Sequence, residues 1–201
     1  MKSLAIFGTG GLGRETLFWI KDKDYERVVF VVDDEYFQSR EVAGKEVFRR
    51  SEISVEDFEW VLAVSDGKAR KKIVEKLGPS ARYASLIHPT AMVGETNEIG
   101  EGTIIRANVT ITCDVKIGKH GYFGPGVAVG HDSVLGDYVS ISPRVFISGN
   151  CKIGDEVSIG VGALIREKIE IAPGTVVGMG AVVVKDLSGG IYVGNPARLL
   201  R

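Results

Sequence analysis

The sequence is poor in cysteine and histidine and has no excess of charge of either sign. Cys113 and Cys151 are too few for a disulfide framework and lack metal-ligand spacing, so we expect two reduced thiols. Lysine and arginine number 25 against 26 acidic residues, which leaves no basic footprint for nucleic acid. There is no run of 18 apolar residues and no signal peptide pattern, so we expect a cytoplasmic protein without membrane insertion.

Glycine and the aromatic residues are unevenly distributed along the chain. The first 86 residues hold both tryptophans and 11 of the 16 aromatic residues, but only 7 of the 26 glycines. This shift places a domain boundary near Leu86. We expect a nucleotide-sugar-binding domain over residues 1–86, a repeat domain over 87–187 and a C-terminal tail over 188–201.

The N-terminal part has the pattern of a small α/β sheet. An apolar run, Leu4–Phe7, leads into the glycine-rich stretch Gly8–Gly13, and helix-like spacing follows. A second apolar run ends in Asp33 and Asp34, where carboxylates can accept hydrogen bonds from ribose hydroxyls. The remaining elements complete half of a doubly wound sheet: we expect strands at 45–48, 60–64 and 82–87 and a helix at 68–77.

The glycine-rich stretch predicts a phosphate site, because a pyrophosphate must approach backbone N–H groups that a Cβ would obstruct. The motif is weakly specific, and a tight turn without a ligand is the alternative. The acidic pair at the next strand end favours the binding site. A dehydrogenase needs two mononucleotide-binding halves and a substrate domain, which 86 residues do not supply. The pattern therefore favours a nucleotide-sugar over NAD.

A hexapeptide repeat runs without interruption over residues 87–183. An alternating strand has period two and a helix 3.6, so period six requires a short strand and a corner, repeated. Three such sides make an 18-residue triangular coil with stacked aliphatic side chains inside, a parallel β-helix. The repeated apolar positions are Ile87, Val93, Ile99, Ile105, Ile111, Ile117, Phe123, Val129, Leu135, Ile141, Ile147, Ile153, Ile159, Ile165, Ile171, Val177 and Val183.

The 18-residue period predicts which residues stack on one corner. Cys113, His131 and Gly149 form one such column, so the coil beside His131 has no side chain and leaves room there for a slender ligand. Val161 and Met179 form a second column on a different corner.

Only three histidines are available as general bases. Asp132 follows His131, and a carboxylate that reaches the imidazole would fix its tautomer and raise its basicity. His88 precedes Pro89 at the domain junction and is most simply a turn residue. His120 lies at the fourth place of its hexad, on another side from His131, and is expected to face solvent or a subunit contact.

The whole chain resembles the sialic-acid and nucleotide-sugar acetyltransferases. The resemblance rests on the Gly8–Gly13 turn with its acidic pair, on Leu86-Ile-His-Pro89, on the hexads, and on Val193-Gly-Asn-Pro-Ala-Arg198. It implies an α/β N-terminal half-Rossmann domain followed by an all-β left-handed parallel β-helix, an exception to the right-handed crossover rule. It also implies a homotrimer with acyl-CoA between subunits, so that the His131 column of one chain faces the Val161 column of the next.

The same resemblance implies the site residues. His131 and Asp132 match the general base and its acidic partner, and Ser140 stands where the family has a second histidine that contacts acetyl-CoA. Further acetyl-CoA contacts are implied near Gly149, Val161 and Met179. Contacts to the nucleotide-sugar are implied at Gly10, Gly11, Leu12, Asp33, Asp34 and Ser65. No metal is implied.

The expected reaction is direct transfer of acetyl from acetyl-CoA to a sugar amine, with His131 taking the proton. An O-acetyltransferase acting on sialic acid or a related sugar needs the same base and fits nearly as well. Cys113 as a covalent nucleophile has no sign of activation. A γ-class carbonic anhydrase shares the prism but needs three converging histidines, which these positions do not provide. A non-catalytic nucleotide-sugar-binding scaffold is the rival of a different class.

Overall fold

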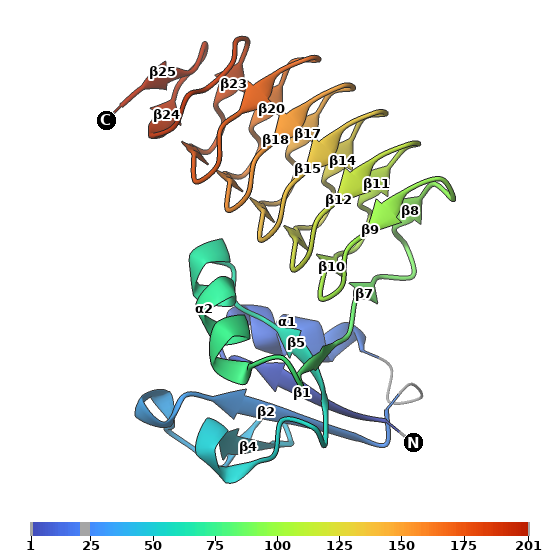
Figure 1. Ribbon diagram of the computed structural model, residues 1–201, viewed down its shortest axis with the longest axis vertical. Helices are drawn as coiled ribbons and strands as arrows, with labels where there is room; N and C mark the ends of the chain where they lie inside the picture. Colours follow the sequence, from blue (N-terminus) through green and yellow to red (C-terminus); the bar gives the residue numbers. More distant parts are fainter. Residues whose placement is uncertain (1, 21–24, 201) are drawn as a thin grey trace. The chain divides into compact units, whose positions relative to one another are not determined.

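The computed structural model describes residues 2–20 and 25–200, and it divides the chain into two compact units. One unit comprises the chain up to Ser65 together with Ala69–Ala84, and the other comprises Asp66–Lys68 together with the chain from Ser85 onward. Figure 1 shows the first unit as a small α/β domain in blue to green and the second as a stack of coils in green to red. No helix in the described part of the chain is long and apolar enough to cross a membrane.

The first unit is built on a six-stranded sheet in the order β3-β4-β2-β1-β5-β6. All neighbours pair in parallel except β3 and β4, which form an antiparallel hairpin at one edge. Its strands are β1 (Ser3–Phe7), β2 (Arg27–Val32), β3 (Glu41–Val42), β4 (Lys45–Arg49), β5 (Glu59–Leu62) and β6 (Arg82–Tyr83). The central strands are continuous apolar runs because a parallel sheet is covered on both faces.

Two helices and two short 3-10 turns complete this unit. The helices are α1 (Gly11–Trp19) and α2 (Gly67–Leu77), and the 3-10 turns are η1 (Asp34–Tyr36) and η2 (Arg50–Glu52). Both helices follow a strand of the sheet, as the βαβ pattern predicts. The run 82–87, expected as one strand, is divided: Arg82–Tyr83 joins the α/β sheet, whereas β7 (Leu86–Ile87) pairs with the first coil of the repeat.

The second unit is a parallel β-helix of three sheets, which confirms the predicted fold class. Face 1 comprises β7, β10 (Ile104–Ile105), β13 (Tyr122–Phe123), β16 (Ser140–Ile141), β19 (Ser158–Ile159), β22 (Val176–Val177), β24 (Ile191–Val193) and β25 (Arg198–Leu199). Face 2 comprises β8 (Met92–Val93), β11 (Thr110–Ile111), β14 (Ala128–Val129), β17 (Phe146–Ile147), β20 (Leu164–Ile165) and β23 (Val182–Val183). Face 3 comprises β9 (Glu98–Ile99), β12 (Lys116–Ile117), β15 (Val134–Leu135), β18 (Lys152–Ile153) and β21 (Glu170–Ile171).

The strand register follows the predicted 18-residue coil. Ile105 pairs with Phe123, which pairs with Ile141, and the other faces repeat the same spacing. From Ile105 to Val183, the second residue of each two-residue strand points inward, and these side chains are buried in one continuous core. Each coil buries its apolar residues against its neighbours, so stability accumulates coil by coil.

The corners of the coils share one backbone conformation. From Gly102 to Gly180, every sixth residue has a positive φ near 60–70°. This is the fourth place of each hexad, the second central residue of a turn that needs the left-handed region. Nine of these corner residues are not glycine; asparagine and aspartate, which take this conformation most readily after glycine, supply four of them.

The outer surfaces of face 2 and face 3 differ in chemistry. On face 3, Lys116 pairs with Glu98 and Lys152 with Glu170, each pair one coil apart. Face 2 presents an apolar outer row instead, in which Met92, Phe146 and Leu164 are 70%, 51% and 48% exposed. Large apolar side chains in register on one exposed face of a protein indicate a contact surface.

Candidate functional site

At the corner between faces 2 and 3, the imidazole of His131 is hydrogen-bonded to the carboxylate of Asp132. Nδ1 of His131 lies 2.7 Å from Oδ2 of Asp132, and both side chains are more than half exposed. In the neutral imidazole, an Nδ1–H that donates to the carboxylate leaves the lone pair of Nε2 free to accept a proton. The pair therefore has the arrangement of a general base and its orienting acid.

The three residues of the predicted column lie one coil apart. The amide of Asp132 donates to the carbonyl of Cys113, and the amide of Asn150 donates to the carbonyl of His131. Gly149 lies under the imidazole: a Cβ there would come within 2.7 Å of Nε2 and 2.8 Å of Cε1 of His131. The space over Gly149, expected to admit a ligand, is thus taken up by the histidine ring itself. Glycine at this position sets where Nε2 lies.

The conformation of Asp132 contributes to this geometry. Its φ is 59°, the left-handed corner conformation shared by the fourth place of each hexad from Gly102 to Gly180. His131 occupies the third place, and the turn between the two residues brings their side chains to the same point of the corner. The repeat alone thus supplies the backbone on which the pair is built.

The predicted acetyl-CoA contacts lie at two kinds of position. Val161 and Met179 stand on the corner between faces 1 and 2, exposed to 48% and 80%, and the amide of Gly180 donates to the carbonyl of Val161. Glycines flank both residues, so this corner offers an apolar ridge with little bulk beside it. Ser140 lies on β16 of face 1 between Tyr122 and Ser158 and is only 6% exposed.

The other two histidines lie away from the His131–Asp132 pair, whereas Cys113 belongs to the same column as His131. His120, expected to face solvent or a subunit contact, is only 2% exposed within the single chain and stacks on Tyr138 with ring centroids 5.2 Å apart, so that expectation is wrong. His88 accepts from the amide of Thr90 in a local turn. Cys113 is exposed, whereas Cys151 is buried, and burial raises the pKa of its thiol.

Metal ligands do not gather at this corner. In residues 2–20 and 25–200 there is no group of three or more histidine, cysteine, aspartate or glutamate side chains placed to hold a metal ion.

In the α/β unit, the glycines of the Gly8–Gly13 turn lie in different surroundings. A Cβ on Gly13 would collide with the carbonyl of Gly8, so this glycine lets helix and strand pack closely. Gly8 itself has a φ of 107°. Around Gly10 and Gly11 a Cβ would meet nothing within 4 Å, so the start of α1 at Gly10, Gly11 and Leu12 is open to a ligand. The first N–H groups of a helix have no acceptors within it and suit an anion.

The acidic pair after β2 divides into two roles. Asp33 lines a cleft of about 570 Å³ and its Oδ1 lies 2.7 Å from Nζ of Lys76. Asp34 lines a neighbouring hollow together with Asp33 and Lys76, and its carboxylate accepts from the hydroxyl of Ser51 at 2.6 Å and from the Ser51 amide at 3.2 Å. The hydrogen bond from the Ser51 hydroxyl holds the pKa of Asp34 below its usual value. Asp34 therefore also holds the loop at Ser51, whereas Asp33 lines both hollows.

Sequence reasoning missed three side chains of this unit. Nη1 of Arg70, which is 1% exposed, donates to the carbonyls of Val64 and Ser65 and so fixes the loop that carries Ser65. Lys72 and Lys76 line the same cleft as Asp33 from α2. Only their four-residue spacing within the predicted helix could have placed them on one face.

Comparison with known proteins agrees with both units. Residues 3–77 match the PglD N-terminal domain. Over its full length the chain is also similar to the acetyltransferase domain of PglB from Neisseria gonorrhoeae FA1090 in complex with acetyl coenzyme A, with 32% identity, a TM-score of 0.89 and 99% of each chain covered. The chain belongs to the hexapeptide-repeat family of nucleotide-sugar acetyltransferases. It is thus an enzyme of the acyltransferase class.

Other members of this family differ in their named substrates. UDP-N-acetylbacillosamine N-acetyltransferase of Bacillus subtilis is 34% identical over 115 residues. That match covers 53% of this chain, and the chain spans about half (52%) of the length of that enzyme. A His-to-Asn mutant of perosamine N-acetyltransferase from Caulobacter crescentus, in complex with CoA and GDP-perosamine, is 25% identical with a TM-score of 0.90, covering 98% of this chain and 96% of that one.

Proposed function

We propose that this acyltransferase uses acetyl-CoA to acetylate the amino group of a nucleotide-activated amino sugar, with His131 as general base. The observation that carries the proposal is the 2.7 Å contact between Nδ1 of His131 and Asp132, which leaves Nε2 as the acceptor. The named relatives support it, because they are N-acetyltransferases of nucleotide-linked sugars and one is bound to CoA and GDP-perosamine.

In the proposed reaction, the sugar amine attacks the thioester carbonyl of acetyl-CoA and Nε2 of His131 takes the proton of the amine. The carboxylate of Asp132 stabilises the imidazolium that forms. A main-chain N–H holds the oxyanion of the tetrahedral intermediate. When the carbon–sulfur bond breaks, the thiolate leaves and the imidazolium returns a proton to it. The products are free CoA and the N-acetylated sugar, without an acyl-enzyme.

We propose that the active unit is a homotrimer formed through face 2. Its apolar outer row needs a cover, and three copies of one face around a threefold axis bury it completely. The two corners that border face 2 are the His131 corner and the Val161–Met179 corner. In such a trimer the His131 corner of one subunit adjoins the Val161–Met179 corner of its neighbour, where the slender pantetheine chain of acetyl-CoA fits the apolar ridge. A cytoplasmic location follows from the need for acetyl-CoA.

The assembly is tested by replacing one apolar residue of face 2. Leu164→Glu is expected to give monomers by sedimentation velocity and to abolish turnover, because a buried unpaired carboxylate is costly. Lys152→Glu on face 3 is the matched control and is expected to leave the trimer intact. A wild-type chain that sediments as a monomer would contradict the proposal.

The reaction is tested by supplying acetyl-CoA with nucleotide-linked 4-amino sugars and measuring release of free thiol. Mass spectrometry of the product separates N-acetylation from O-acetylation of a sugar hydroxyl, the nearest alternative. A thermal-shift assay with CoA separates both from a non-catalytic scaffold, which is expected to show no shift.

A further inference from the structure

The cleft of the α/β unit lies at the carboxyl edge of its sheet and has one face of α2 as a wall. Phe7, Gly8 and Thr9 come from the end of β1, and Val32 and Asp33 from the end of β2. The wall from α2 contributes Ala69, Lys72, Ile73 and Lys76. At about 570 Å³ the cleft has the size of a small-molecule site, and the crevice beyond the carboxyl ends of parallel strands is where such sheets bind ligands.

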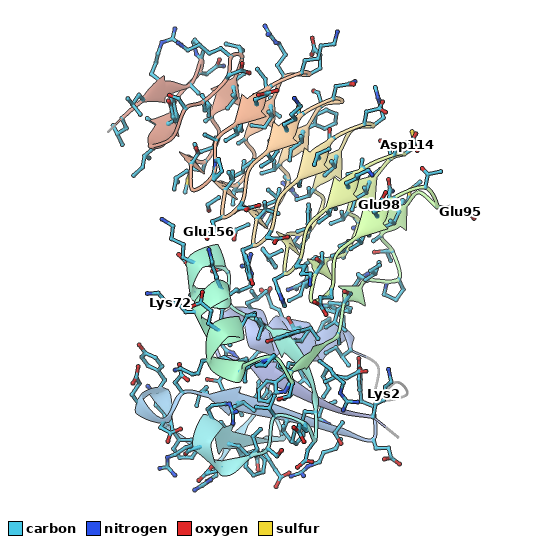
Figure 2. All side chains as sticks on the ribbon, in the orientation of Figure 1. Lys2, Lys72, Glu95, Glu98, Asp114 and Glu156 are labelled. Atoms are coloured by element: carbon cyan, nitrogen blue, oxygen red, sulfur yellow. The ribbon has the colours of Figure 1, made fainter. Side chains whose placement is uncertain are left out.

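The two lysines of this wall are in different electrostatic states. Lys72 and Lys76 are one helical turn apart and face the same cleft. The positive charge of Lys76 is balanced by Asp33, because its Nζ lies 2.7 Å from a carboxylate oxygen of that side chain, which is only 18% exposed. Lys72 is exposed, and among residues 2–20 and 25–200 no carboxylate pairs with it. Figure 2 labels Lys72 and shows its side chain extending outward from α2.

The glycine-rich turn across the cleft provides only part of what a diphosphate needs. The N-cap of α1 is Gly10, which makes no side-chain capping hydrogen bond, and the first turn of the helix contains no acidic residue. The helix end contributes about half a positive charge. A nucleoside diphosphate carries at least two negative charges, so it needs a full cation as well, and the carboxylate of Glu35 in the lining makes that need greater.

We propose that Lys72 is the diphosphate-binding residue of the α/β unit, and that Lys76 is reserved for holding and neutralising Asp33. This inference rests on the proposed function, since it assumes that the acceptor is a nucleotide-sugar. It assigns the ammonium of Lys72 to the phosphates, the N-terminus of α1 to the remaining phosphate oxygens, and Asp33 to the nucleoside. No base-specific contact is needed for this role, so Lys72 acts equally on uridine, guanosine and thymidine diphosphates.

The test is calorimetric titration of the full chain with UDP, GDP and dTDP. Lys72→Met is expected to lower the affinity for the diphosphate that the wild type binds by about tenfold or more, because one charge-assisted hydrogen bond is lost. Lys72→Arg is expected to restore most of the affinity. Lys71→Met is the control, because it removes the same charge from the neighbouring residue of α2, which does not line the cleft. Binding to the wild type is expected to weaken with ionic strength, and binding to Lys72→Met much less so.

Three results of these titrations would contradict the assignments. Wild-type affinity in Lys72→Met overturns the assignment of Lys72 while leaving the proposed function intact. Equal losses in Lys71→Met and Lys72→Met also overturn it, because the helix would then act through its general charge. If the wild type binds none of the three diphosphates, the nucleotide-sugar proposal itself is wrong, and Lys72 has no diphosphate to bind.

Discussion

His131 and His120 stand on two corners of the same prism, and each imidazole lies over a glycine of an adjacent coil, Gly149 and Gly102 respectively. His131 is at the third place of its hexad, more than half exposed, and bonded to Asp132. His120 is at the fourth place, with a φ of 55°, buried, and stacked on Tyr138. One repeat has thus placed the same residue type beside an exposed carboxylate and in a packed environment.

The fourth place by itself does not bury a side chain, since Asp132 occupies it with its side chain 55% exposed. The difference between the two histidines therefore lies in their neighbours: His131 has the carboxylate of Asp132 beside it, and His120 has the ring of Tyr138.

The strongest test of this comparison is to remove each imidazole. His131→Ala is expected to lower kcat by about 10³-fold, within the range for loss of a general base, and to leave the melting temperature unchanged. His120→Ala is expected to keep kcat within about twofold but to destabilise the fold by about 1–3 kcal/mol, through the lost ring stacking and the cavity. Steady-state kinetics and thermal unfolding measure both. An inactive His120→Ala with a wild-type melting temperature would overturn the comparison.

The next test adds one methyl group under each ring. Gly149→Ala brings a Cβ within 2.7 Å of Nε2, so the ring must move, and kcat is expected to fall by about 10²-fold. Stability should change little, because the group displaced is a movable side chain. Gly102→Ala places a Cβ against the buried His120 at a φ of 70°, and is expected to cost about 1–2 kcal/mol with little change in kcat. Equal losses of stability in the two variants would contradict this division.

A smaller effect is expected from changing the partner of His131. Asp132→Asn removes the charge that stabilises the imidazolium, and kcat is expected to fall by about 10- to 100-fold, less than for a buried triad because the pair is half exposed. Asp132→Gly should lose as much activity, yet keep its stability within about 1 kcal/mol because glycine suits the left-handed corner. Full activity in Asp132→Asn would remove the carboxylate from the mechanism.

The smallest effect is expected from the third member of the His131 column. Cys113→Ala should keep kcat within about twofold, because direct transfer does not use the thiol. The measurement is the rate of CoA release, together with intact-mass analysis during turnover. Loss of activity, or an acetyl adduct on Cys113 in the wild type, would replace direct transfer with a covalent mechanism.

Much of the β-helix could be predicted from the sequence because every contact in it repeats at a fixed spacing. The column of Cys113, His131 and Gly149 follows from counting, and the main-chain hydrogen bonds between Cys113, Asp132, His131 and Asn150 match it. The environment of His120 could not be predicted, since it depends on the rotamer of a ring beside Tyr138. In hexads the period fixes which residues stack, but not which way a corner side chain turns.

The α/β unit was predictable only in outline. Its strands and glycine turn follow from local pattern, whereas Lys76 and Asp33 meet from positions 43 residues apart. The separate tasks of Asp33 and Asp34 depend on Ser51, a residue that no motif marks. Pairings of this kind come from the tertiary fold. The lining of the cleft could therefore be identified only from the structure, whereas the β-helix could be predicted from the sequence.

The 18-residue coil also limits how the length of this chain can change. Insertion or deletion of 18 residues within the repeat keeps every strand on its face and only lengthens or shortens the prism. Deletion of six residues turns all that follows back by one side, which would move charged residues of face 3 onto the surface where face 2 is apolar and move His131 and Val161 each to a different corner. Insertions and deletions that keep the faces intact are therefore multiples of 18 residues, that is, whole coils of the β-helix.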